Sequence, residues 1–405
     1  MTQPLTNIQI LVADDQTDVA KTLCMPLRRA KARLTFVGDG QAALDALAAQ
    51  PFDLILIDMK MPPEEWGGLW LLRQLHAEGS RIPTLVLSGE GAKQQVKLAM
   101  RLGATDWIDK DDADQELLDR VTTVLASHHE QTLTIASEQL PTPIASRLAR
   151  YIRTTDPEKQ LTEGLHALES VLRFAAVVGL SSTPPFALPG ITIEKLAAPA
   201  MGTWFNVCTA LADGPDASSN FRRLFACVAP DSAARQHLQG FIPIRNGIFH
   251  DSADPHPEDL ARLDAYLRRI SHRMISCGAG DLAVAKSMTY DGEKYAVELL
   301  SLRGTGKPSP DALLTSTPVV SGTVLLVAKD VEPIPLSPLM ATAMAEPPGS
   351  VQCLQFNGFV RGKGELGPTS ALKFARTNVT EEHSSASHPS LTWPAVAAWT
   401  SHPRE

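Results

Sequence analysis

Five short apolar runs recur along the first third of the chain, and segments of helical periodicity separate them. The runs occupy residues 8–13, 34–37, 53–57, 84–87 and 107–108. Between them, apolar residues return every three or four positions, as in residues 42–49, 69–76 and 94–102. Strands that are apolar on both faces are typical of a buried parallel sheet, whose strands are joined by helical crossovers. The pattern predicts a doubly wound α/β domain with five parallel strands.

Polar side chains lie at the carboxyl ends of these runs, which is where parallel sheets carry their binding and catalytic residues. They are Asp14 and Asp15 after the first run, Asp58 after the third, Ser88 after the fourth and Lys110 after the fifth. Three carboxylates that share one edge repel one another, and a hard cation such as Mg²⁺ relieves that repulsion with oxygen ligands. An aspartate beside such a cation can attack phosphorus, while the lysine and the hydroxyl hold the new phosphoryl oxygens.

Residues 8–127 resemble the receiver domain of two-component response regulators, which has a flavodoxin-like fold. The resemblance makes Asp58, within the sequence DMKMP, the phosphoacceptor, and it makes Asp14, Asp15 and Asp58 the Mg²⁺ ligands. It places Ser88 at the switch hydroxyl, Lys110 at the invariant lysine and Trp107 at the switch aromatic position. The implied partner is a histidine kinase or a phosphotransfer protein that donates the phosphoryl group.

Two positions depart from the usual receiver pattern. Asp111 follows Lys110, where the family usually has proline, and the glycine of the loop after Asp58 falls one position late in PPEEWGG. Both positions lie beside the site and could change the lifetime of the phosphoryl group or the choice of partner. The alternative to a phosphoacceptor site is an α/β domain whose acidic residues are solvated loop ends.

Residues 141–278 carry a helical pattern. In LTEGLHALESVLRFAAVVGL, apolar residues follow a spacing of three and four, and turn sequences such as GPDASS separate further helical segments. Four or five packed helices are expected there. Residues 128–140 are polar and lack a clear period, which predicts a linker between this bundle and the receiver domain.

The sequence FIPIRNGIFHD lies within the predicted bundle and contains Arg245, Asn246 and His250. On an ideal helix Arg245 and His250 lie ~140° apart, so a shared site would need a partner helix or a break near Gly247. The motif is similar to the Arg-x4-His signature of HEPN domains (higher eukaryotes and prokaryotes nucleotide-binding), several of which are metal-independent ribonucleases built at a dimer interface. That resemblance implies His250 as general acid or base, Arg245 as phosphate holder and Asn246 as polar helper. A hydrogen-bond network between helices, or an inactive bundle that binds partners, is the alternative.

The pattern changes again after residue 280. Two runs flank Asp291-Gly292, which is a strong hairpin signal, and further short strands follow between glycines and prolines. Residues 281–377 therefore predict a small antiparallel β domain, with a barrel as one form of it. Residues 378–405 are rich in Ser and Pro and predict a flexible tail, with Trp393 and Trp399 as residues that could dock on a partner.

Composition narrows the class of protein. The 405 residues carry a net charge of −8, which argues against a chain-wide basic surface for nucleic acid. Five cysteines are scattered without a Cys-x-x-Cys spacing, as expected of reduced thiols, and no apolar stretch reaches the ~18 residues of a membrane helix. We expect a cytoplasmic protein that makes no membrane contact.

The sequence predicts a multidomain response regulator with an atypical output region. Phosphorylation of Asp58 would switch the helical and β regions through dimerisation or protein docking, and a homodimer is expected. The alternative is an enzyme, a phosphorylation-gated ribonuclease that uses Arg245 and His250. Nucleic acid is a partner only under that alternative.

Overall fold

The computed structural model describes residues 5–89, 93–214, 216–249, 256–278, 280–328, 331–345, 350–360, 366, 370–376, 382–385 and 396–400. The chain forms two compact units. The first contains residues 1–132, 226–234 and 268–277, and the second contains residues 133–225, 235–267 and 278–405.

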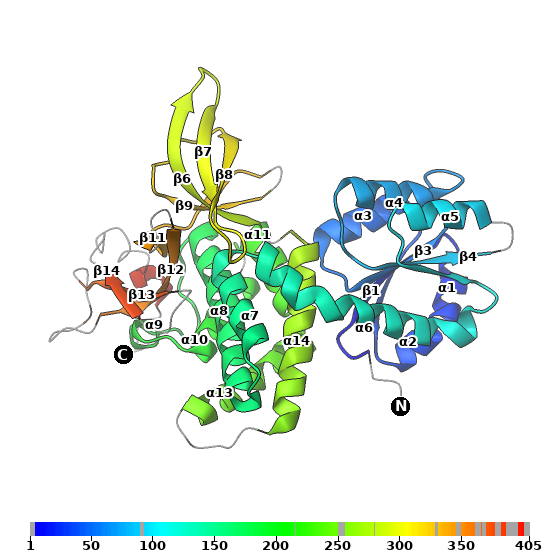
Figure 1. The fold of residues 1–405 in the computed structure, drawn as a ribbon, viewed down its shortest axis with the longest axis horizontal. Coiled ribbons are helices and arrows are strands. Elements are labelled where there is room, and N and C mark those ends of the chain that lie inside the picture. Colours follow the sequence, from blue (N-terminus) through cyan, green and yellow to red (C-terminus); the bar gives the residue numbers. More distant parts are fainter. Residues whose placement is uncertain are drawn as a thin grey trace. The chain divides into compact units, whose positions relative to one another are not determined.

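A five-stranded parallel sheet lies at the centre of the first unit (Figure 1). Its strands are β1 (Gln9–Ala13), β2 (Arg33–Val37), β3 (Leu54–Asp58), β4 (Thr84–Ser88) and β5 (Asp106–Asp109), in the order β2-β1-β3-β4-β5. Every residue of β1 and β3 is buried, as expected of central strands covered on both faces. The five predicted strands and their parallel arrangement are confirmed.

Helices cover both faces of this sheet. Figure 1 shows α3 (Gly40–Ala49), α4 (Gly67–Ala77) and α5 (Lys93–Arg101) on one face, and α1 (Thr17–Leu23), α2 (Met25–Arg29) and α6 (Ala113–Gln139) on the other. Alternate residues of the strands point to opposite faces. Ile10 and Leu56 therefore belong to the core on one side of the sheet, and Leu11 and Ile57 to the core on the other.

Helix α6 corrects the predicted linker. It continues from Ala113 to Gln139 without a break, so residues 128–139 are helical. Its later turns bury Leu133 and Ala136, and Leu140 is buried directly after the helix. This i, i+3, i+7 spacing is that of one apolar helix face. The polar residues of the segment lie between these positions and hide the period.

The first unit also contains the C-terminal half of α14 (Pro257–Ser276). Arg273 of this helix and Asp53, which precedes β3, are 1% and 0% exposed. Arg273 donates to both carboxylate oxygens of Asp53, at 2.8 and 2.6 Å, and to the carbonyl oxygen of Asn7 at 2.7 Å. A fully buried, bidentate ion pair therefore holds α14 to the amino-terminal end of β3.

The second unit begins with a helical region, as predicted. Besides parts of α11 (Ser219–Val228), α12 (Ser232–Gln239) and α14, it contains α7 (Thr142–Arg153), α8 (Pro157–Ser182), α9 (Ile193–Ala197), α10 (Met201–Asp213) and α13 (Phe241–Phe249). Helices α9 and α10 are separate, because Pro199 between them cannot continue α9. Helix α8 is long and apolar enough to cross a membrane, but 83% of its most apolar window is buried inside the structure, as in a core helix.

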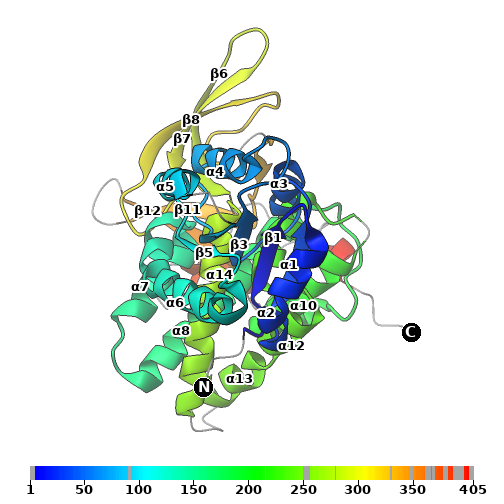
Figure 2. The ribbon, with the colours of Figure 1, turned by 90° about the vertical axis from the view of Figure 1, so that its right-hand side faces the viewer.

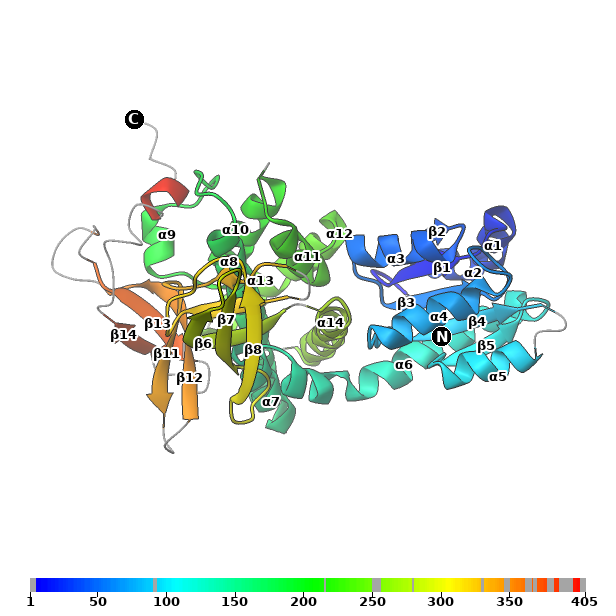
Figure 3. The same ribbon diagram turned by 90° about the horizontal axis from the view of Figure 1, so that it is seen from above.

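The β region forms two antiparallel sheets (Figure 3). The first contains β6 (Asp281–Tyr290), β7 (Tyr295–Ser301), β8 (Ser309–Thr315), β9 (Val324–Val327) and β10 (Ile334–Pro335), in the order β10-β9-β6-β7-β8. The second is β11-β12-β13-β14, formed by Met340–Ala345, Ser350–Phe359, Leu372–Arg376 and Glu382–Ser385. The hairpin predicted at Asp291-Gly292 is confirmed, and its tip projects from the rest of its sheet (Figure 2). The antiparallel β region that the sequence predicts is confirmed, and it consists of two sheets in place of one small sheet or a barrel.

The end of the chain contains ordered elements that correct the predicted tail. Strand β14 falls within residues 378–405, and Trp399 is buried with its carbonyl oxygen accepting a hydrogen bond from the Leu188 N–H at 2.9 Å. Trp399 is therefore not a docking residue for a partner. Trp393 lies outside the described residues.

Candidate functional site

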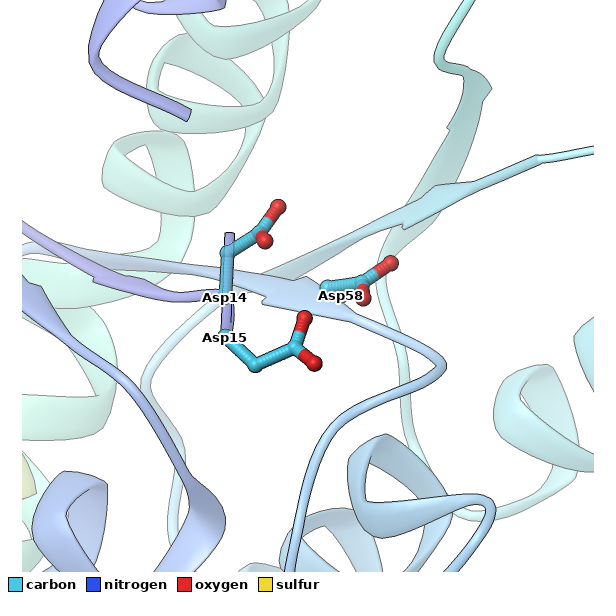
Figure 4. Close-up of side chains that lie close together, drawn as sticks. All are labelled: Asp14, Asp15 and Asp58. Carbon is cyan, nitrogen blue, oxygen red and sulfur yellow. The ribbon is translucent and has the colours of Figure 1, made fainter. Parts of the chain in front are cut away.

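Three aspartates meet at the carboxyl edge of the parallel sheet. Asp14 and Asp15 follow β1, and Asp58 ends β3, which is the neighbour of β1 in the sheet. Their side chains lie close together and extend toward the same side (Figure 4), and one oxygen from each carboxylate lies within 4.8 Å of the others. Asp14 and Asp58 are buried, while Asp15 is exposed and leaves the cluster open to solvent. The structure thus brings together the three carboxylates that the sequence placed at this edge.

Lys110 joins this cluster from the end of β5. Its Nζ donates to Asp14 Oδ2 at 2.9 Å and forms an ion pair with Asp58 Oδ1 at 3.0 Å. The ammonium group therefore bridges two carboxylates from different strands and neutralises part of their charge. The opposite oxygen of Asp14 accepts the Gln16 backbone N–H at 2.8 Å, which fixes the direction of that carboxylate.

Burial, together with the crowding of charges, shifts the pKa values of Asp58 and Lys110. Burial raises the pKa of Asp58, the nearby Asp14 and Asp15 raise it further, and the hydrogen bond from Lys110 acts against them. Burial alone would lower the pKa of Lys110, but its bonds to Asp14 and Asp58 outweigh this and raise it. Lys110 is therefore a permanent cation at neutral pH. A cation added among the carboxylates would favour the ionised form of Asp58.

The loop after Asp58 packs tightly against the strand that carries it. A Cβ atom on Gly68 would lie 2.4 Å from the carbonyl oxygen of Asp58, and one on Gly67 would lie 2.0 Å from the carbonyl oxygen of Met61. Only glycine fits at such close approaches. The pair that ends PPEEWGG therefore lets α4 begin directly beneath the phosphoacceptor candidate.

Ser88 and Trp107 are placed by their strands. Ser88 is the last residue of β4 and pairs with Asp109 of β5, although its side chain lies outside the part of the structure that is described. Trp107 lies on β5, the edge strand of the sheet, and is 42% exposed. An exposed tryptophan on an edge strand is free to change its orientation or to contact a partner.

The donor set of the cluster fits a divalent cation of the Mg²⁺ type. Mg²⁺ prefers oxygen ligands, is bound through one or two carboxylates and keeps several water molecules. Buried Asp14 and Asp58 supply anionic oxygens, and exposed Asp15 leaves room for water on the open side. Lys110 supplies a second positive charge at the same place, and two cations next to an attacking carboxylate suit the charge of a transferring phosphoryl group.

The second candidate site falls on α13. Arg245 is partly buried, forms an ion pair with Glu169 of α8 at 3.2 Å and lies over the ring of Phe249. Asn246 is exposed. His250 lies outside the described residues, so the proposed meeting of Arg245 and His250 stays a prediction.

Several polar and charged residues around Arg245 were not predicted from the sequence. Glu163, His166, Glu169 and Arg173 follow one another on α8 at intervals of three, three and four residues. That spacing places polar groups on one stripe of a helix that is otherwise apolar. The spacing of these residues is present in LTEGLHALESVLRF, where the more numerous apolar residues dominate the pattern.

Comparison with known proteins agrees with the first site. A family model described as "Response regulator receiver domain" matches residues 10–122. The transcriptional regulatory protein FixJ of Bradyrhizobium diazoefficiens is 34% identical over 159 residues, which cover 39% of this chain and 73% of FixJ. The response regulator MprA of Mycolicibacterium vanbaalenii is 32% identical over 118 residues, 29% of this chain and 50% of MprA.

Solved structures also resemble the receiver region. The receiver domain of the Francisella response regulator 1452 is 26% identical, with a TM-score of 0.28, and the match covers 30% of this chain and 98% of that domain. The identity with FixJ and the share of FixJ that is covered show the family of this chain, and the family model places the receiver domain at residues 10–122. This chain belongs to the response regulators of two-component systems and carries their receiver domain at residues 10–122.

Proposed function

We propose that this protein is a phosphorylation switch in which Asp58 accepts a phosphoryl group and changes the contacts of the helical and β regions. The donor is a histidine kinase or a phosphotransfer protein, and Asp14, Asp15 and Asp58 hold Mg²⁺ during the transfer. The observation that carries this proposal is Lys110 Nζ, which lies 2.9 Å from Asp14 and 3.0 Å from Asp58 within a cluster of three carboxylates.

Each residue of the site has a separate role in the phosphoryl transfer. A carboxylate oxygen of Asp58 attacks the phosphorus of the donor, an O–P bond forms, and the P–N bond of a phosphohistidine donor breaks as the imidazole leaves. Mg²⁺, when bound, supplies charge neutralisation for the phosphoryl oxygens. Lys110 gives up its bond with the Asp58 carboxylate and donates to a phosphoryl oxygen instead, and the Ser88 hydroxyl donates to another.

A new phosphoryl group adds negative charge at the edge of the sheet. The conformational change begins with the side chains that respond to this charge. Ser88 on β4 moves toward the phosphoryl group, and Trp107 on the neighbouring β5 repacks into the space that this opens. The surface of α4, β5 and α5 then presents a different face to partners. Continuous α6 begins three residues after Lys110 and extends to Gln139, so it gives a stiff covalent connection from the site to the output region.

Under this proposal the output acts through protein contacts in the cytoplasm, with a homodimer as the phosphorylated state. The ribonuclease alternative has less support. Arg245 already pairs with Glu169, and His250, which this alternative needs, lies outside the described residues. Cleavage of labelled RNA by the full-length protein, lost in His250→Ala, would favour the alternative.

The switch is tested with beryllofluoride, which mimics a phosphoryl group on aspartate. The full-length protein is treated with Mg²⁺ and beryllofluoride, and its mass is followed by light scattering while hydrogen exchange is measured over β4 and β5. We expect protection at β4 and β5 and a shift toward dimer, both absent in Asp58→Ala. Equal exchange with and without beryllofluoride would contradict the switch, and protection without a change in mass would replace dimerisation by docking on another protein.

A further inference from the structure

Three histidines form a cluster where α6 contacts the C-terminal half of α14, within the first unit. His128 and His129 belong to α6, and His272 belongs to α14. Nε2 of His128 lies 3.0 Å from Nδ1 of His272, and the two rings pack edge to face with their centroids 4.7 Å apart. The centroid of the His129 ring lies 6.1 Å from that of His272. Imidazole groups from both helices therefore form part of the contact between them.

The histidine cluster is built for neutral rings. In the 3.0 Å contact one nitrogen must donate and the other must accept, so the hydrogen bond cannot form between two imidazolium rings. His272 is 1% exposed, and His128 and His129 are half-buried. The Nε2 atoms of His129 and His272 are buried and have no hydrogen-bond partner among the described residues. An imidazolium would need an acceptor at each ring nitrogen, and the cluster does not supply one.

Positively charged side chains face the histidine cluster from α14 and from the segment before β4. They are Arg268, Arg269 and Arg273 of α14 and Arg81 before β4. Asp53 faces the cluster with a negative charge, but its carboxylate already accepts two hydrogen bonds from Arg273. A proton added to the cluster would therefore meet positive charge, and the carboxylate that could balance it is already engaged.

These surroundings link the contact to pH. Burial and the neighbouring cations lower the pKa of His272 to about 3 and that of His129 to about 4, and burial lowers the pKa of His128 as well. Once the helices separate, the rings regain their ordinary pKa of 6.5. Because the pKa is lower in the packed state, the contact keeps its full strength above pH 6.5 and weakens as the pH falls from 6.5 toward 4. The pair of Asp53 and Arg273 does not weaken in this range, since the pKa of Asp53 lies below 3.8.

We propose that the histidine cluster is a pH-sensitive contact that holds α14 against α6 and the receiver sheet at neutral pH and releases it in acid. Helix α6 continues to Gln139 and α14 begins at Pro257, so both helices extend from the first unit into the second. Release of the contact therefore alters helices that the receiver shares with the output region. It needs no phosphoryl group on Asp58, so acid acts on the switch as an input separate from phosphorylation.

Hydrogen exchange of the full-length protein tests the proposal through the opening of α14 at pH 7.5 and pH 5.0, corrected for the intrinsic pH dependence of amide exchange. Peptides that cover residues 268–277 report on the contact. Helix α5, which lies on the other face of the sheet from α6 (Figure 1), is the internal reference. The test variants are His129→Gln and His272→Phe, whose new side chains take up no proton. The matched control is His76→Gln, which replaces an exposed histidine of α4.

The expected effect follows from the pKa values of the packed and open states. Each histidine that stays neutral in the packed state makes opening about 30-fold more favourable at pH 5.0 than at pH 7.5, so His129 and His272 together give about a thousandfold. We expect this rise at α14 in the wild-type protein and in His76→Gln, with a rise of less than about tenfold at α5. Each test variant should reduce the rise by about 30-fold. Comparing each variant with itself at the two pH values removes any loss of stability that does not depend on pH.

Three results would overturn the proposal. The first is equal opening of α14 at both pH values in the wild-type protein. The second is a full rise in both His129→Gln and His272→Phe, which would place the titrating groups elsewhere. The third is a rise at α5 as large as that at α14, because the whole receiver would then unfold in acid and the contact would not be released by itself.

Discussion

The buried ion pair between Arg273 and Asp53 allows a quantitative prediction for Arg273→Met. In the wild-type protein Asp53 accepts three hydrogen bonds, two from Arg273 and one from the Gln9 backbone N–H at 2.7 Å. The variant leaves a fully buried carboxylate with only the bond from Gln9. Removing one partner of a buried pair typically costs about 3–5 kcal/mol.

The protonation of Asp53 sets an independent bound on this cost. A carboxyl group with an ordinary pKa of 3.8 can be neutralised at pH 7 for about 4.4 kcal/mol, at 1.36 kcal/mol per pH unit. The same step costs about 1 kcal/mol at pH 4.5. Burial alone would raise the pKa of Asp53, but in the wild-type protein Arg273 outweighs this effect and keeps the pKa below 3.8. The ion pair therefore stabilises the fold fully above pH 3.8, and this stabilisation is lost as the pH falls further. The difference between the two proteins should therefore shrink as the pH falls.

Hydrogen exchange of peptides that cover β1 and β3 measures the local free energy of opening at each pH. We expect Arg273→Met to lower it by about 3–5 kcal/mol at pH 7 and by less than about half of that at pH 4.5. The double variant Asp53→Leu with Arg273→Met should recover part of the loss, because no buried charge remains. Lys21→Met, which removes an exposed ion pair with Asp18, is the control and should leave the free energy of opening nearly unchanged. A loss below about 1 kcal/mol at pH 7, or one that grows on acidification, would contradict the stabilising role of this ion pair.

Two further predictions follow from buried groups. All five cysteines are buried, and burial raises the pKa of Cys24 and of Cys353 to about 12. The native protein should therefore not react with a thiol reagent at pH 8, whereas the protein unfolded in urea should show five reactive thiols. Rapid reaction of a native thiol would contradict this burial. Gly68→Ala should cost about 1–3 kcal/mol and slow the phosphorylation of Asp58, because the added methyl group meets the Asp58 carbonyl oxygen. Gly38→Ala, where nothing lies within 4 Å, is the control for thermal unfolding and phosphorylation, and an equal effect of both changes would remove the steric explanation.

The receiver domain could be predicted because each of its strands and site residues is marked by a short stretch of sequence. Each strand is a short apolar run, and the parallel topology brings Asp14, Asp58 and Lys110 to the same edge once the strands are assigned. The close packing of Gly68 against Asp58 could not be predicted, since the sequence shows a glycine but not the carbonyl oxygen that lies 2.4 Å from its missing Cβ atom.

The predictions that failed depend on contacts between distant parts of the chain. The end of α6 is fixed in part by α14, where His272 lies 3.0 Å from His128 and Arg268 donates to the carbonyl oxygen of His129 at 2.8 Å. Trp399 is held by Leu188, more than 200 residues away in sequence. The division of the β region into two sheets depends likewise on pairings such as β6 with β9, which local patterns do not encode.

The most direct test of the account is phosphorylation of the full-length protein by acetyl phosphate and Mg²⁺, followed by intact-mass and peptide mass spectrometry. We expect the gain of one phosphoryl group, located at Asp58, with no gain in EDTA and none in Asp58→Ala. Lys110→Ala should accept the group more slowly than the wild-type protein. A phosphoryl group that still appears on Asp58→Ala, or the absence of any labelling of the wild-type protein, would contradict the assignment of this edge of the sheet as the phosphoacceptor site.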